Sequence, residues 1–379
     1  NGALHYNRAM LSLGMIPQDS RELLAKPIWE AFGGKSRDEL KSDISQLAHA
    51  GRHAVRACLK ASSCRKAEFG IDYADYGHGV NLPHCQPMLE LGRLLTLSAI
   101  YAQIEGSWDD SAAMLFEGIR MGRHMLEQPT LAETITGVRI LENNYFALAF
   151  WAAKCPDESL VHQAFVRFEA ATNGMVRPGF ALANEASIIE KQMTGVIEAY
   201  PDGPWAEMLL DAMGEFTLGK DRQQLEANAI AKCQSLGVPK AVFQSESSFE
   251  AFVSKLRDLR GRYFRSLASC MILPPQQRHE AATKFYNQFK GELSKFTKSE
   301  LIKPDDLVSI FATHEAERTM VRLALAVAGS RKEGLFPTSL NQVAPQFHGQ
   351  IPTSPYDGSE IVYKQLNAGE DFSILIPAA

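Results

Sequence analysis

The chain has 379 residues, of which 39 are Lys or Arg and 44 are Asp or Glu, so its formal net charge is −5. A length of roughly 150 residues per domain predicts two or three domains. The hydrophobic content of 45% excludes a largely disordered chain, and the acidic balance disfavours nucleic acid as the main partner. The longest apolar run, residues 145–153, is far shorter than the roughly 18 residues that cross a bilayer.

Helical periodicity dominates the sequence up to about residue 333, which predicts an all-helical body. The expected helices span residues 2–14, 20–32, 36–61, 86–105, 108–127, 130–154, 157–172, 180–200, 204–217, 220–235, 240–271, 275–297 and 304–331. Two of the starts have a physical cause. Ser36 can cap the helix that follows it, and Pro304 with Asp305 and Asp306 combines a first-turn proline with favourable negative charge.

One local signal of repeated helical hairpins lies between residues 93 and 125. Gly106, Trp108 and Gly118 resemble the turn and second helix of a tetratricopeptide repeat. No second unit follows at the roughly 34-residue period, so an ordinary helical hairpin with a glycine turn is an equal alternative. Both interpretations predict paired antiparallel helices. The predicted fold class is mainly α, with a tetratricopeptide-like solenoid of helical hairpins as the body.

The chain changes character from residue 304 onward. The last long helix is followed by a Pro-rich segment, residues 351–358, and by two β-rich runs, residues 360–366 and 371–376. The runs flank a turn sequence and predict a β-hairpin. We therefore divide the chain into an all-helical repeat-like domain, residues 1–303, and a small α+β module, residues 304–379. The hairpin must pack on the helices, because two strands alone are marginally stable.

Three stretches of the chain together carry a resemblance to known proteins. They are Asn1 to Ala9; then Cys64, Gly70 to Tyr73, Leu82 to His84, Arg93 to Leu95 and Gly106 to His124; and finally Gly334 to Leu340, Pro355 to Gly358 and Tyr363. Together they resemble a family of uncharacterised exported bacterial proteins that are abundant in Planctomycetes. The closing stretch is also similar to the region after the long helix in type II secretion pseudopilins. The resemblance implies a periplasmic or cell-envelope location and no particular activity.

The start of the chain is consistent with this resemblance. The first residue is Asn1 rather than Met, and the opening residues read as an amphipathic helix rather than as a signal peptide. We therefore expect that an N-terminal signal or anchor segment has been removed.

His49 and His53 lie four residues apart on one face of a predicted helix, a spacing that can hold zinc. No Glu follows His49 to complete an HExxH motif, and Arg52 and Arg56 would repel a cation. An ordinary solvated helix face is the alternative.

The irregular stretch from residue 62 to residue 85 gathers several side chains of types that bind metals. They are Cys64, Asp72, Asp75, His78, His84 and Cys85. A connection of this length is unusual in a compact domain and is typical of functional loops. Structural packing, a disulfide between Cys64 and Cys85, and a metal site are all compatible with the sequence.

Glu185 is a candidate for general acid or base catalysis, because paired carboxylates can carry such chemistry. Glu190 is a poor partner for Glu185, because a separation of five residues does not place both side chains on one face of a helix. His162 and Glu169 could converge with Glu185 across neighbouring helices, and solvated helix faces are the alternative.

Asp357 and Asp371 belong to a group of oxygen ligands around the terminal hairpin, which could bind calcium. A Pro-Tyr-Asp-Gly sequence is also a good turn without any ion.

Residues 240–303 contain 12 Lys or Arg against 6 Asp or Glu, with aromatic residues interleaved. Such a pattern can stack on single-stranded nucleic acid. However, Phe285, Phe289 and Phe296 recur at helical spacing, which indicates a buried stripe. An acidic protein or envelope surface is the better partner for this region.

The sequence supports two hypotheses about function. The first is a noncatalytic exported helical protein that binds a protein or peptide partner and has no cofactor. Its membrane contact would be limited to a removed N-terminal anchor. The second is a hydrolase whose His, Glu or Asp site, with or without zinc or calcium, lies between helices. A deep pocket where His49, His53, His84 or Glu185 converge would favour the enzyme, and a broad open groove would favour the binding protein.

Overall fold

The structure is a computed structural model that describes residues 1–26, 28, 37–71, 82–175, 178–199, 206, 209, 222–295, 297 and 301–377. Within these ranges the chain is mainly helical, with a two-stranded antiparallel sheet near the C-terminus, so the predicted helical body is confirmed. None of the helices in these ranges has both the length and the apolar character needed to cross a membrane. Most of the predicted helix 204–217 lies outside the described residues.

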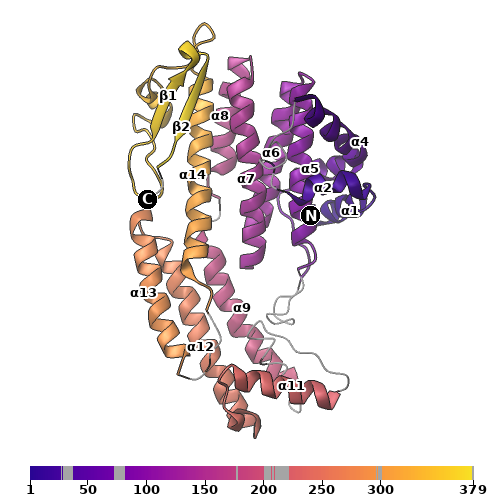
Figure 1. Ribbon diagram of the computed structural model, residues 1–379, viewed down its shortest axis with the longest axis vertical. Helices are drawn as coiled ribbons and strands as arrows, with labels where there is room; N and C mark the ends of the chain where they lie inside the picture. The colour runs from indigo at the N-terminus through magenta and orange to yellow at the C-terminus, as the bar shows by residue number, and fades with distance from the viewer. Residues whose placement is uncertain are drawn as a thin grey trace.

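The first half of the chain forms a layer of consecutive helices (Figure 1). They are α1 (Gly2–Leu13), α2 (Gln18–Ala25), α4 (Arg37–Ser62), α5 (Cys85–Ile104), α6 (Trp108–Leu126), α7 (Leu131–Lys154) and α8 (Glu158–Thr172). Helix α4 packs against α5, α5 against α6 and α6 against α7, while α1 packs against α4 and α8 against α6. Short connections join α5 to α6 and α6 to α7, so these helices form the antiparallel hairpins that the sequence predicts.

Two glycines explain the geometry of the α5–α6–α7 layer. Gly106 in the connection from α5 to α6 has a φ of +85°, a left-handed backbone conformation that residues other than glycine rarely adopt. Gly118 lies where α6 crosses α7, and a Cβ atom there would be 2.0 Å from Asn144 Oδ1. The same Asn144 oxygen accepts a hydrogen bond from Thr96 on α5 at 3.2 Å. A buried amide thus joins three helices at their closest approach.

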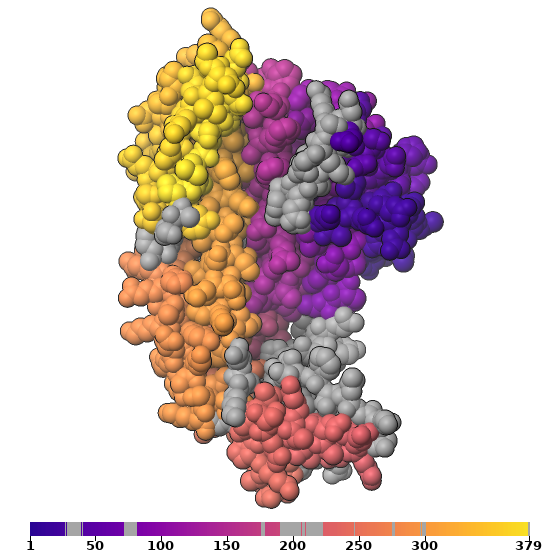
Figure 2. Space-filling model, viewed as in Figure 1, coloured from indigo at the N-terminus to yellow at the C-terminus, as the bar shows by residue number. Residues whose placement is uncertain are grey.

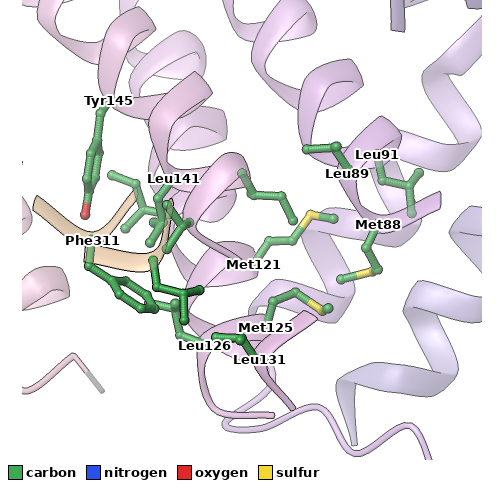
Figure 3. Packing of buried hydrophobic residues seen from close by; sticks show 14 of the residues in the cluster. Met88, Leu89, Leu91, Met121, Met125, Leu126, Leu131, Leu141, Tyr145 and Phe311 are labelled. Carbon is green, nitrogen blue, oxygen red and sulfur yellow. The ribbon is translucent and has the colours of Figure 1, made fainter. Parts of the chain in front are cut away.

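The core continues from this layer to a helix far along the chain, α14 (Pro304–Ala328). Figure 3 shows Met88 of α5, Met121 and Met125 of α6, Leu141 of α7 and Phe311 of α14 grouped in one cluster of apolar side chains. These side chains are almost completely buried. The predicted start of α14 is confirmed, since its first turn begins with a proline and contains two aspartates.

A second group of helices lies at the opposite end of the molecule from the hairpin (Figure 1). It consists of α9 (Pro178–Ala199), α11 (Arg222–Ser235), a 3-10 turn η2 (Lys240–Phe243), α12 (Glu246–Cys270) and α13 (Pro275–Leu293). Helix α12 packs along α9 and α13, and α13 packs on α14.

The predicted single helix 240–271 is wrong in one respect. Its first turn, η2, is separate, because the Ser245 hydroxyl accepts a hydrogen bond from the Ser248 N–H at 3.3 Å and so begins α12 as a new helix. The aromatic residues of this region form a core: Phe249, Tyr263 and Phe289 are nearly inaccessible to solvent. Of the predicted stripe, Phe289 is buried and Phe285 is partly buried, while Phe296 lies outside the described residues.

The C-terminal segment lies along α14 (Figures 1 and 2), and its Phe347 ring lies 5.8 Å from the Phe165 ring of α8. It contains η3 (Leu340–Phe347), β1 (Val362–Leu366), η4 (Asn367–Gly369) and β2 (Asp371–Leu375). Tyr363 pairs with Ile374 in the antiparallel ladder, and η4 closes the hairpin where the turn was predicted. Helix α14 packs on α7 and α8 and touches η3 and β2, so it is the support on which the hairpin lies. The division of the chain at residue 303 stays a prediction.

Candidate functional site

An open groove of about 700 Å³ runs between α4, α5 and the start of α6. The apolar side chains that line it come from all three helices. They are Val55 and Leu59 of α4, Tyr101 of α5 and Met114 of α6, with Ala48, Ala102 and Ala113 between them. The groove therefore offers an apolar floor of the kind that holds a peptide segment.

The two walls of the groove carry opposite charges. Arg52 and Arg56 lie one turn apart on α4, and neither forms an ion pair with a described residue. The opposite wall carries Glu105 and Asp110, of which Glu105 pairs with Lys41 at 2.6 Å. Among the described residues, two unpaired positive charges on the α4 wall thus face one unpaired negative charge, that of Asp110, on the opposite wall.

The two histidines predicted as zinc ligands are both exposed on α4. His49 lines the groove, whereas Arg52 Nε lies 3.5 Å from His53 Nε2 in donor geometry. That contact places a guanidinium, which would repel a cation, beside one ring nitrogen of His53. Throughout the described ranges, no group of three His, Cys, Asp or Glu side chains is arranged to hold a metal ion. His78, with Asp72 and Asp75, lies outside the described residues.

His84 belongs to a buried network at the start of α7. Its Nε2 atom lies 2.8 Å from Glu133 Oε1, and the exposed fractions of the two side chains are 5% and 0%. The Phe69 ring stacks on the imidazole at 4.2 Å. Glu133 Oε2 also accepts hydrogen bonds from the Thr130 hydroxyl at 2.7 Å and the Thr130 N–H at 3.2 Å, completing a capping box. This pair fastens the loop before α5 to α7 and is closed to solvent.

The carboxylate of Glu185 also serves the start of α7. It accepts the Leu131 N–H at 3.0 Å. Burial raises the pKa of Glu185, and this hydrogen bond offsets only part of the rise. His162 is exposed on α8, and Glu169 pairs with Arg322 at 2.8 Å. The two carboxylates therefore contact different residues, Glu185 at the start of α7 and Glu169 on α14. The Glu190 side chain lies outside the described residues.

All six cysteines are free, so the Cys64–Cys85 disulfide considered from the sequence is not formed. Burial raises the pKa of the Cys85 thiol to about 11. Cys64 is half-buried, with its thiol 3.5 Å from the Lys60 carbonyl. The raised pKa of the Cys85 thiol disfavours the thiolate that a nucleophile needs.

The two aspartates considered for calcium serve local turns. The Asp357 carboxylate accepts the Ser359 N–H at 2.9 Å, and hydrogen bonds with Ser359 hold its pKa below the usual value. Asp371 Oδ1 accepts the Phe372 N–H at 2.9 Å, and its other oxygen lies 3.8 Å from Lys154 Nζ. Both carboxylates are thus engaged separately.

A hydrogen-bond relay that sequence reasoning missed links α1, α6 and the end of α4. Tyr6 Oη lies 3.0 Å from His124 Nδ1, and His124 Nε2 lies 3.0 Å from the Cys64 carbonyl oxygen. Because a carbonyl only accepts, Nε2 carries the proton and the Tyr6 hydroxyl donates to Nδ1. Burial lowers the pKa of His124, which favours this neutral form. No sequence spacing could reveal it, since its members lie 60 and 118 residues apart.

Comparison with known proteins adds no assignment: the chain matches no protein-family model, no curated protein and no solved structure.

Proposed function

We propose that the chain is a noncatalytic helical protein that binds a partner protein or peptide in the groove between α4, α5 and α6. The observation that carries the proposal is the groove itself, which is open, measures about 700 Å³ and has apolar side chains from three helices. Amphipathic segments of partner proteins bind in grooves of this kind, with apolar side chains as anchors. Apolar partner residues would contact Val55, Leu59 and Met114.

The charges favour an acidic amphipathic segment as the occupant. The uncompensated Arg52 and Arg56 are spaced to meet carboxylates on successive turns of a partner helix. Asp110 on the opposite wall would repel the same carboxylates, so the segment has one preferred orientation.

The positions of the other candidate residues favour binding over hydrolysis. His84 and Glu185 are engaged at the start of α7, and His49 lines the groove without His53. The groove thus lacks the nucleophile and base pairing that would make a hydrolytic site recognisable among its described residues.

The finer fold and the location belong to the same proposal. We infer a tetratricopeptide-like arrangement of α4 to α7, supported by the Gly106 turn and the close approach of α6 and α7 at Gly118. The resemblance to exported Planctomycetes-type proteins supports a periplasmic or cell-envelope location. Fractionation of the native host tests the location, and a full-length cytoplasmic protein with no signal or anchor would contradict it.

Selection from a display library of short random peptides tests the binding proposal. We expect enriched peptides to combine acidic and apolar residues at spacings of three or four. Arg52→Glu should weaken their binding about tenfold or more, the effect of losing one charge-assisted contact. Arg8→Glu is the matched control, because Arg8 is an exposed arginine of α1 outside the groove.

Two results would contradict the proposal. One is the absence of any enriched sequence. The other is a set of peptides that bind wild type, Arg52→Glu and Met114→Arg equally well. Met15→Arg controls for the second substitution, since Met15 is 85% exposed elsewhere on the surface.

A further inference from the structure

A second pocket lies where the end of α4, the middle of α6 and α8 meet, and it is lined by four arginines. Its volume is about 440 Å³, within the roughly 300–1,000 Å³ of small-molecule sites. Arg65 comes from the segment after α4, Arg120 and Arg123 from α6, and Arg167 from α8. Three separate parts of the chain therefore direct guanidinium groups to one cavity.

Two of these four charges are compensated. Arg120 donates to Glu117 Oε1 at 2.7 Å, and the other oxygen of that carboxylate accepts the Ser62 hydroxyl at 2.8 Å. Arg123 donates to Glu127 at 3.0 Å.

The other two charges are not compensated. Arg65 and Arg167 form no ion pair with any residue that the structure describes. The pocket therefore has an excess of two positive charges.

Arg167 is held so that its charge faces the pocket. Its guanidinium carbon lies 4.2 Å from the centre of the Phe116 ring, which is almost fully buried beneath it. Burial and the nearby Arg120 both lower the pKa of Arg167. Stacking occupies the flat face of the guanidinium and leaves its N–H edge available for a bidentate contact with an oxyanion.

The segment that carries Arg65 is anchored on both sides. The relay from Tyr6 through His124 holds the carbonyl of Cys64, and Gln128 Nε2 donates to the Ala67 carbonyl at 2.7 Å. An anchored backbone reduces the entropy lost when a ligand binds. The neutral state of His124 also means that this relay adds no charge to the pocket.

The geometry points to a binding site for a small organic phosphate. A phosphate monoester carries a charge of about −1.5 to −2 at neutral pH, which matches the two uncompensated arginines. The cavity is larger than a phosphate group, and Ala170 and Ala171 give the remaining space an apolar lining for the organic part. This site is separate from the groove between α4 and α5.

Calorimetric titration of the whole chain with phenyl phosphate tests the inference. We expect saturable binding that weakens about tenfold to a hundredfold in Arg65→Gln and in Arg167→Gln, the effect of losing one contact to a charged group. Arg8→Gln removes the same net charge from an exposed arginine outside the pocket and should bind as wild type does. Unchanged circular dichroism spectra would show that each variant folds.

Other ligands separate the alternatives. Phenol should not bind, and inorganic phosphate should bind more weakly than phenyl phosphate. Succinate binding as tightly as phenyl phosphate would overturn the assignment to phosphate. Equal binding by the Arg8, Arg65 and Arg167 variants, or no binding of phenyl phosphate at all, would overturn the site. Arg52→Glu should leave phenyl phosphate binding unchanged, so failure of the groove proposal is distinguishable from failure of this one.

Discussion

Replacing Gly118 with Ala should destabilise the protein at the crossing of α6 and α7. The new methyl carbon would lie 2.0 Å from Asn144 Oδ1 and 2.5 Å from its Cγ, far inside van der Waals contact. Asn144 cannot yield cheaply, because its amide nitrogen donates to the Ile140 carbonyl at 2.8 Å and its oxygen accepts from Thr96 at 3.2 Å. The clash therefore moves the helices apart or breaks these buried hydrogen bonds.

The expected loss follows from three contributions. Overpacking a core costs about 1–3 kcal/mol, and leaving a buried polar group without its partner costs about 1–3 kcal/mol. Replacing glycine by alanine inside a helix returns about 1 kcal/mol. The free energy of unfolding of Gly118→Ala should therefore fall by about 1–5 kcal/mol, measured by urea denaturation.

Gly291→Ala is the matched control, because Gly291 lies in α13 and a Cβ there would meet nothing within 4 Å. That variant should gain about 0.5–1 kcal/mol from helix propensity alone. If Gly118→Ala proved as stable as Gly291→Ala, the close approach of α6 and α7 described above would be wrong.

Three further predictions concern stability. Burial, and to a smaller extent the neighbouring Glu142, raise the pKa of Glu317 to about 8, above its unfolded value. The folded state therefore holds the proton of Glu317 more tightly than the unfolded state, and the stability that this proton contributes is lost as the pH rises towards 8. Between pH 6.5 and 8 the free energy of unfolding of wild type should fall by about 1 kcal/mol, a figure already reduced for the partial exposure of Glu317. Glu317→Gln should not show this fall. If urea denaturation gave parallel pH profiles for the two proteins, the prediction would be wrong. His84→Ala leaves the buried Glu133 without its imidazole and should cost about 3 kcal/mol in urea denaturation, against almost nothing for the exposed His53→Ala. Tyr363→Ala should cost about 2 kcal/mol in urea denaturation, less than a fully buried aromatic, because Tyr363 is only half-buried. Its hydroxyl donates to the Pro337 carbonyl at 2.5 Å, and an unchanged free energy of unfolding would mean that the hairpin does not depend on this contact.

Local features of the fold could be predicted from the sequence because their causes are local. The start of α14 follows from a proline and two aspartates in its first turn. The hairpin turn follows from Asn367 and the residues after it, where Asn367 and Ala368 adopt positive φ angles. The break before α12 was missed, since the cap at Ser245 competes with a continuous helical pattern that extends across it.

The sites could not be predicted, because they are assembled from distant parts of the chain. His84 was singled out for its chemistry, but its partner Glu133 lies 49 residues away in another helix. The arginine pocket combines residues from α4, α6 and α8, and no spacing along the sequence relates Arg65 to Arg167. Residue type alone identified some of the side chains that take part in these networks. Which of them contact each other depends on how the helices pack.

The position of α14 sets the order in which the chain can fold during synthesis. The imidazole of His314 stacks on the Tyr145 ring at 5.6 Å, and Arg322 pairs with Glu169 at 2.8 Å. Helices α7 and α8 are therefore covered by residues made about 150 to 170 positions later. Until α14 leaves the ribosome, an apolar face of the nascent helical layer stays open to water and to other chains. Termination before residue 304 would therefore yield a product that binds chaperones or aggregates. The helical layer buries its apolar face only after α14 has been synthesised.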